Sequence, residues 1–132
     1  MEESLKFNSQ ICTTQIQSQR LLDLGLKPET ADMHHYKWSE GYWDIYACPP
    51  RGADSCYVPA WSLHRLIKIL PTVITHDDYS LILGVNATCV CYADDESAEI
   101  FKSFDGDLYE CITRCIEWLI KEDYFNKEYL KQ

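Results

Sequence analysis

The chain has 132 residues, 46% of them hydrophobic and 13% aromatic, which is enough apolar material for one packed core and too much for a disordered chain. Its 21 acidic and 12 basic residues give a formal net charge of −9, so general attraction to a phosphate backbone is excluded and direct nucleic-acid binding is not expected. An acidic start and the lack of a long apolar run predict neither a secretory signal nor a membrane span, and we expect a cytoplasmic protein.

The first predicted element is a short helix. Thr14 and Gln17 have the spacing of a capping box, in which each side chain satisfies the backbone N–H of the other residue. Leucines supply an apolar side after this cap, and Gly25 permits the left-handed turn that commonly ends a helix. Pro28 supports the break, because proline cannot continue a helix.

The segment from residue 30 to residue 46 is crowded with aromatic side chains around a central glycine. This pattern is typical of two short extended segments joined by a turn. Alternation along the second segment places Trp43 and Ile45 on one side and Tyr42 and Tyr46 on the other.

A loop and a short helix follow. Residues 48–55 contain two prolines and a glycine, so we expect the longest loop of the chain here. Residues 58–71 predict an amphipathic helix that begins near Pro59 and ends at Pro71, because proline suits a first turn and stops a helix. The predicted buried stripe of this helix is formed by Leu63, Leu66, Ile67 and Leu70.

The second half of the chain predicts strands and then a longer helix. Residues 80–85, 88–92 and 99–104 are β-rich and are separated by turn residues, so we expect an antiparallel meander. Asp107 and Glu110 predict a second capping box, and the helix that follows should lie across the sheet. Its apolar face is formed by Leu108, Cys111, Ile112, Cys115, Ile116 and Leu119.

Together these elements predict one α+β domain over residues 1–132. Its small antiparallel sheet has three or more strands and is packed by about three helices, of which the C-terminal one is long. The length fits one domain, and no internal repeat or low-complexity segment divides the chain.

Four of the seven cysteines form two pairs, each on one face of a predicted element. If the strand and the helix pack together, four thiolates can meet, which is the ligand number of a structural zinc site. Such ligands usually come from loops, however, and buried cysteine also packs as a small hydrophobic residue. The sequence favours core packing in a reducing compartment, with no metal and no cofactor, for Cys89, Cys91, Cys111 and Cys115.

A second set of thiols and imidazoles lies around the predicted loop. Cys48, Cys56, His34 and His35 offer either a metal site or a nucleophile with its base. No nucleophile signature surrounds them, so loop thiols with surface histidines are the preferred interpretation, and no catalytic residue is predicted. A metal- or thiol-dependent enzyme remains an alternative function.

Aromatic residues concentrate in the first half of the chain, and a short basic stripe follows on the predicted middle helix. Exposed aromatic side chains beside a loop give large contact area at low loss of side-chain entropy, which is typical of recognition surfaces. Core packing explains many of the aromatic residues equally well, and a solvated helix face explains the basic stripe. The predicted binding surface comprises Trp38, Tyr42, Trp43, Arg51, Tyr57, His64, Arg65 and Lys68.

Acidic residues gather around the predicted meander and the start of the last helix. A row of carboxylates can imitate nucleic-acid phosphates or bind a divalent cation, although turn and cap chemistry explains most of these positions. The second alternative is therefore an acidic nucleic-acid mimic that inhibits a host nucleic-acid-binding protein. The residues concerned are Asp94, Asp95, Glu96, Glu99, Asp105, Asp107 and Glu110.

Short motifs in three parts of the chain carry a resemblance. Residues 30–33 (Thr-Ala-Asp-Met), residues 59–63 (Pro-Ala-Trp-Ser-Leu) with residues 70–71 (Leu-Pro), and the helix at residues 111–119 resemble small proteins encoded by phages, prophages and other mobile elements of Bacteroides-type bacteria. No function is assigned to that group, so the resemblance implies no site residue and no activity. It implies a bacterial cytoplasm and a small accessory product.

The preferred interpretation is a non-enzymatic phage or mobile-element accessory protein that binds another protein. The aromatic first half and its loop are the predicted contact region. A second copy of the chain is one form that this partner can take, which would make a homodimer.

Overall fold

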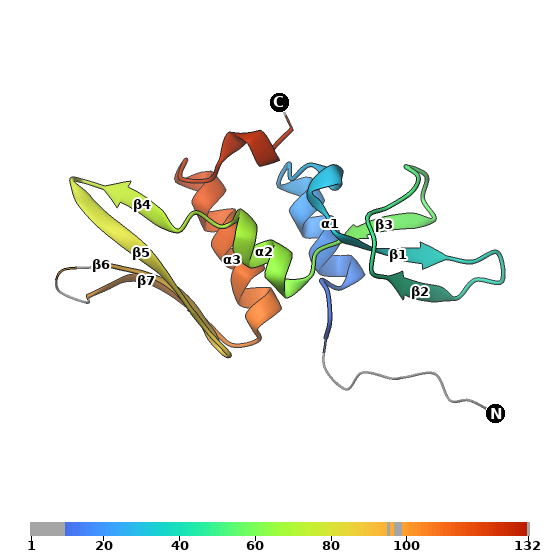
Figure 1. The fold of residues 1–132 in the computed structure, drawn as a ribbon, viewed down its shortest axis with the longest axis horizontal. Helices are drawn as coiled ribbons and strands as arrows, with labels where there is room; N and C mark the ends of the chain where they lie inside the picture. The colour runs from blue at the N-terminus through green and yellow to red at the C-terminus, as the bar shows by residue number, and fades with distance from the viewer. Residues whose placement is uncertain (1–9, 95, 97–98, 132) are drawn as a thin grey trace.

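A computed structural model describes residues 10–94, 96 and 99–131 (Figure 1). The helices are α1 (Gln15–Asp23), α2 (Leu63–Ile69) and α3 (Leu108–Lys121), with short 3-10 helices at Pro28–Thr30 and Lys127–Tyr129. The strands are β1 (Met33–Lys37), β2 (Trp43–Tyr46), β3 (Tyr57–Ala60), β4 (Val73–His76), β5 (Tyr79–Asn86), β6 (Cys89–Asp94) and β7 (Ile100–Asp105).

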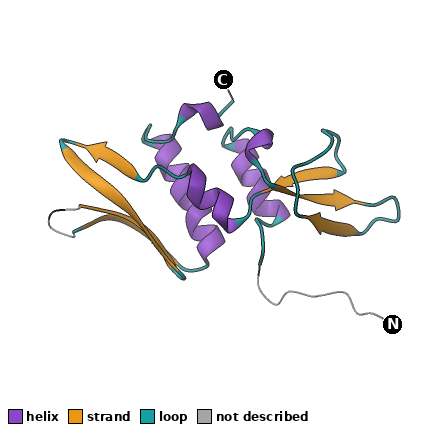
Figure 2. Cartoon of the chain, viewed as in Figure 1, coloured by secondary structure: helices purple, strands orange, loops and turns teal. Residues whose placement is uncertain are grey.

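The strands form two antiparallel sheets. The first has the order β2-β1-β3, and the second has the order β4-β5-β6-β7. The two sheets lie at opposite ends of the molecule with the helices between them (Figures 1 and 2). The predicted α+β class, with antiparallel strands, three helices and a C-terminal helix, is confirmed, and the strands make two sheets instead of the one that we expected.

The main core lies among the helices and the four-stranded sheet. One face of α3 supplies fully buried side chains, including Ile112, Ile116 and Leu119, and α1 adds Leu21. Trp61 is completely buried, and its indole N–H donates to the hydroxyl of Thr30 at 3.0 Å. A smaller cluster of Cys12, Met33 and Ala60 lies under the three-stranded sheet.

Helix α1 begins as predicted. The Thr14 hydroxyl accepts from the backbone N–H of Gln17, and the Gln17 side chain accepts from the backbone N–H of Thr14, both at 3.1 Å. The prediction of a capping box is therefore confirmed. Arg20, in the last turn, pairs with Glu110 and so ties α1 to α3.

Helix α2 is shorter than the sequence predicts. It begins after Ser62, whose hydroxyl accepts from the backbone N–H of Arg65 and whose own N–H donates to the Asp32 carboxylate at 2.8 Å. Pro59 belongs to strand β3 opposite His34 and not to the first turn of the helix. Of the predicted stripe, Leu66 and Leu70 are buried while Leu63 and Ile67 are half-buried, and Ile69 is buried as well.

The meander of β5, β6 and β7 is confirmed, and β4 adds a strand at its edge that the sequence did not predict. At the start of α3, the Asp107 carboxylate accepts from the backbone N–H of Glu110 at 3.1 Å, as expected. The Glu110 side chain does not complete the predicted box. It instead accepts from Arg20 and Gln17 of α1, because α1 packs beside this end of α3.

Candidate binding site

One face of the three-stranded sheet is covered by aromatic side chains. His34 lies opposite Tyr46 across the β1–β2 pair, and Tyr36 lies opposite Tyr57 across the β1–β3 pair. Side chains directly opposite each other in an antiparallel sheet project from the same face, and successive residues alternate between faces. The i, i+2 spacing of His34 and Tyr36 therefore brings all four rings together.

The rings touch in well-defined pairs. His34 stacks on Tyr46 with centroids 5.2 Å apart and planes at 15°, and Tyr36 contacts Tyr57 at 5.0 Å. Trp38, just beyond β1, meets Tyr36 edge to face at 5.2 Å. Each such pair contributes about 0.5–1.5 kcal/mol beyond the area that it buries, so the rings hold one another in place before any ligand arrives.

The loop after β2 closes one side of this aromatic face. The Nδ1–H of His34 donates to the carbonyl oxygen of Cys48 at 2.7 Å, which fastens the loop to the sheet. Gly52 lets this loop approach the Tyr57 ring closely, because a Cβ there would lie 2.7 Å from the ring and either the loop or the ring would have to shift. The loop and the sheet border an open pocket of about 260 Å³, and we call the residues around it the aromatic pocket. Its lining residues are His34, Tyr36, Trp38, Tyr46, Cys48, Arg51 and Tyr57.

The aromatic pocket has largely apolar walls and one cation. Arg51 is the only acidic or basic residue with a full charge among the described residues that line it. Desolvation raises the pKa of the Tyr36 hydroxyl, with further contributions from Tyr57 and Cys56, so this hydroxyl stays neutral and can donate a hydrogen bond at physiological pH. The arrangement suits an apolar side chain with a carboxylate or carbonyl oxygen beside it.

The structure divides the residues of the predicted binding surface that precede α2. Trp38, Arg51 and Tyr57 line the pocket. Tyr42 stacks on Trp38 at 6.3 Å and is 52% exposed, so it extends the same surface outward. Trp43 belongs to the opposite face of the sheet, because alternation along β2 separates it from Tyr46.

The predicted basic stripe lies on α2, outside the residues that line the pocket. His64 and Lys68 are exposed. Arg65 has a structural partner, since its Nε–H donates to the Thr30 carbonyl oxygen at 2.7 Å. The stripe therefore forms no part of the aromatic pocket.

The predicted binding surface did not include four residues of the pocket: His34, Tyr36, Tyr46 and Cys48. The alternation of His34 and Tyr36 within the first extended segment was a usable signal for one face. The contribution of Cys48 had no such signal, because the bond from His34 to its carbonyl depends on where the loop folds.

The suggested set of Cys48, Cys56, His34 and His35 does not converge. His34 faces the aromatic pocket, whereas His35 projects from the other face of β1, where its Nε2 lies 2.9 Å from the Thr13 carbonyl oxygen. No group of three or more histidine, cysteine or acidic residues in the described part of the chain is placed to hold a metal ion.

A different thiol lies near an imidazole. Cys12 Sγ is 4.0 Å from His35 Nε2, and both residues are buried. Burial, and then the carboxylate of Asp32, raises the pKa of this thiol to about 11. His35 Nε2 donates its proton to the Thr13 carbonyl oxygen and so has no free lone pair at that nitrogen for the thiol proton. The pair is therefore not arranged as an activated nucleophile.

The two cysteine pairs differ in how deeply they are buried. Cys111 and Cys115 are completely buried on α3, and burial raises the pKa of Cys115 to about 12. Cys89 and Cys91 on β6 are half-buried, and all four are free thiols. These surroundings fit side-chain packing, because a buried free cysteine packs as a small hydrophobic residue.

The acidic residues do not form one row. Asp94, Glu96 and Glu99 lie at one end of the β6–β7 hairpin, and Asp105 and Asp107 lie at the other end. Glu110 is engaged with Arg20, whose hydrogen bond is the main reason that the Glu110 pKa is lowered. Asp95 lies outside the described residues.

Comparison with known proteins adds no further identification. The chain matches no family model, no curated protein and no solved structure. Within the described residues, every helix is too short or too polar to cross a membrane.

Proposed function

We propose that the protein is a non-enzymatic accessory protein that binds another protein through the aromatic pocket and its rim. One observation carries the proposal. Trp38 and Tyr42 are 37% and 52% exposed, yet they stack on each other above a pocket whose walls are already assembled. Exposed aromatic clusters on a rigid support are the usual anchors of protein interfaces.

The chemistry of the pocket indicates the partner's contribution. A volume of about 260 Å³ accommodates one or two side chains, and the ring faces favour proline or an aliphatic side chain. Arg51 at the loop can receive a neighbouring carboxylate in a bidentate contact. We therefore expect an extended segment that presents an apolar residue next to an acidic one.

The setting is part of the same proposal. The resemblance of residues 30–33 and 59–63 to phage and mobile-element proteins supports an accessory role in a bacterial cytoplasm. The buried thiols, whose pKa values are raised, are compatible with a protein that performs no thiol chemistry.

Affinity capture with matched variants tests the proposal. The tagged protein and a Trp38→Ala/Tyr42→Ala variant are used as baits in a lysate of the organism that encodes the protein. Because interface anchors typically contribute about 2 kcal/mol or more, we expect the variant to lose its partner by about 30-fold or more in quantitative mass spectrometry. Ile16→Ala is the control, since Ile16 is 77% exposed on α1 and lines no part of the pocket.

Equal capture by the wild type and the aromatic variant would refute the proposed surface. Sedimentation of the purified protein distinguishes a second copy of the chain from a different partner, because only a homodimer would dissociate with the Trp38→Ala/Tyr42→Ala change in the absence of lysate.

A further inference from the structure

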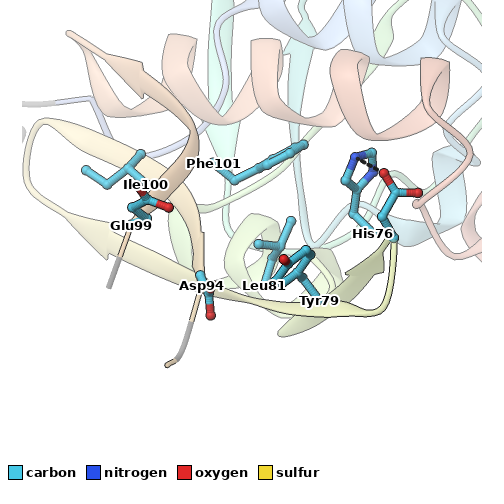
Figure 3. Close-up of a pocket in the computed structure, with 8 residues that line it drawn as sticks. His76, Tyr79, Leu81, Asp94, Glu99, Ile100 and Phe101 are labelled. Atoms are coloured by element: carbon cyan, nitrogen blue, oxygen red, sulfur yellow. Dashed lines mark ion pairs between the residues drawn. The ribbon is translucent and has the colours of Figure 1, made fainter. Parts of the chain in front are cut away.

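A second and larger cavity lies at the other end of the molecule. It has a volume of about 700 Å³ and opens where the ends of β4, β5, β6 and β7 meet (Figure 3). None of its lining residues belongs to the aromatic pocket. We call it the acidic cavity, after the carboxylates on its rim.

The floor of the acidic cavity is apolar. Leu81 is buried in the core beneath it, and Phe101 contacts the His76 ring at 4.7 Å and the Trp118 ring of α3 at 6.2 Å. Figure 3 shows Phe101 directed toward His76. Tyr79 and Ile100 are 61% and 64% exposed beside them. Large apolar side chains are thus presented to solvent on a supported surface, which marks an interaction site.

The rim of the acidic cavity is negatively charged. Asp77, Asp94 and Glu99 line it, and the described residues of the lining include no lysine or arginine. The backbone N–H of Asp94 donates to the Glu99 carbonyl oxygen at 2.8 Å, which fixes two of these residues opposite each other across the hairpin. His76 also lines the cavity, and its Nε2 lies 3.4 Å from the Asp77 carboxylate. The cavity therefore attracts cations.

The turn between β4 and β5 places another carboxylate next to this rim. Asp77 and Asp78 form a two-residue connection and have φ values of 47° and 69°. Turns with positive φ at both central positions strongly favour Asn-Gly or Asp-Gly. Asp77 fits the first of these positions, whereas Asp78 places a carboxylate where glycine is favoured.

We infer that the acidic cavity docks a cationic segment of a partner protein, in which arginine or lysine side chains flank an aliphatic or aromatic one. The apolar floor accepts the central side chain, and the rim carboxylates of Asp77 and Glu99 pair with the cations. Charge complementarity selects this occupant, because a chain with net charge −9 repels nucleic acids and anionic membrane surfaces.

A peptide titration tests this inference. The probe is Ac-Arg-Leu-Arg-Phe-Arg-NH2, added to the full-length ¹⁵N-labelled protein in about 50 mM salt and followed by amide chemical shifts. We expect shifts that saturate and that map to Leu81 and Phe101, and weaker binding at about 500 mM salt because exposed charges are screened. The same peptide with glutamate in place of arginine should not bind.

Two variants of equal charge make the test specific. Asp77→Asn/Glu99→Gln should weaken binding of the arginine peptide about tenfold or more, whereas Glu29→Gln/Glu40→Gln should leave it within about twofold. Glu29 and Glu40 are exposed residues that do not line the cavity. The Trp38→Ala/Tyr42→Ala variant should bind the peptide normally, so this test is independent of the aromatic pocket.

Three results would overturn the inference. The first is the absence of saturable shifts around the cavity, and the second is equal weakening by both charge-removing variants, which would mean that only the overall charge matters. The third is a shift of the same signals with protein concentration alone, which would assign the cavity to a second copy of the chain.

Discussion

Replacing Asp77 by Asn and Asp78 by Gly should make the protein more stable, although it removes two carboxylates from the acidic cavity and its surroundings. The two residues form the whole connection between β4 and β5, and both have positive φ. Asn tolerates this backbone conformation, and Gly adopts it without a steric penalty. The exposed His76–Asp77 contact that would be lost contributes little, because exposed ion pairs are screened by water.

The expected gain in the free energy of unfolding is about 1 kcal/mol. A side chain in the left-handed region costs about 1–2 kcal/mol, and the larger entropy of glycine in the unfolded chain offsets about 0.5–1 kcal/mol of the relief. For a chain of 132 residues, 1 kcal/mol corresponds to an increase in Tm of about 4 °C. The same variant should bind the arginine peptide about tenfold more weakly, so stability and binding should change in opposite directions.

Thermal and urea unfolding followed by circular dichroism measure the stability of this variant. Asp78→Ala is the matched control, because it removes a carboxylate and keeps an unfavourable side chain at φ 69°. This control should be less stable than the wild type by about 0.5–1 kcal/mol. A double variant that is no more stable than the wild type would refute the reasoning from backbone conformation.

Three further experiments test the packing and charges described above. Gly52→Ala should push the loop away from Tyr57 and so weaken binding at the aromatic pocket, while the Tm changes by less than about 2 °C. Normal binding together with unshifted Tyr57 ring signals in NMR would contradict this. Cys115, buried and with its pKa raised to about 12, should resist maleimide at pH 8 until the protein unfolds, and rapid labelling of the native protein would contradict its burial. Because the hydrogen bond from Arg20 lowers the Glu110 pKa in the folded state, the pair stabilises the protein above the unfolded pKa of glutamate and the effect is lost as pH falls through the folded value. Glu110→Gln should therefore flatten the dependence of Tm on pH in this acidic range. The underlying change in the free energy of unfolding should be less than about 1 kcal/mol, because both side chains are over one-third exposed. An unchanged pH profile would exclude the pair as a contributor.

The sequence by itself determined the features that depend on neighbouring residues. The capping box of Thr14 and Gln17 requires only two residues three positions apart, and the structure contains it. The alternation that separates Trp43 and Ile45 from Tyr46 follows from the period of a strand. Turn residues between β-rich runs were sufficient to predict the β5–β6–β7 meander, because hairpin connections are local.

Only the tertiary structure decided the features that depend on distant partners. Pro59 is suited to the first turn of a helix, but pairing with β1 places it in a strand. Glu110 had the spacing of a capping residue, and the packing of α1 beside α3 gives it Arg20 instead. The aromatic pocket requires β3 and the loop after β2 to meet β1, and the floor of the acidic cavity requires Phe101 to lie against His76 of β4 and Trp118 of α3. Such pairings join residues far apart in the chain, so no local pattern specifies them.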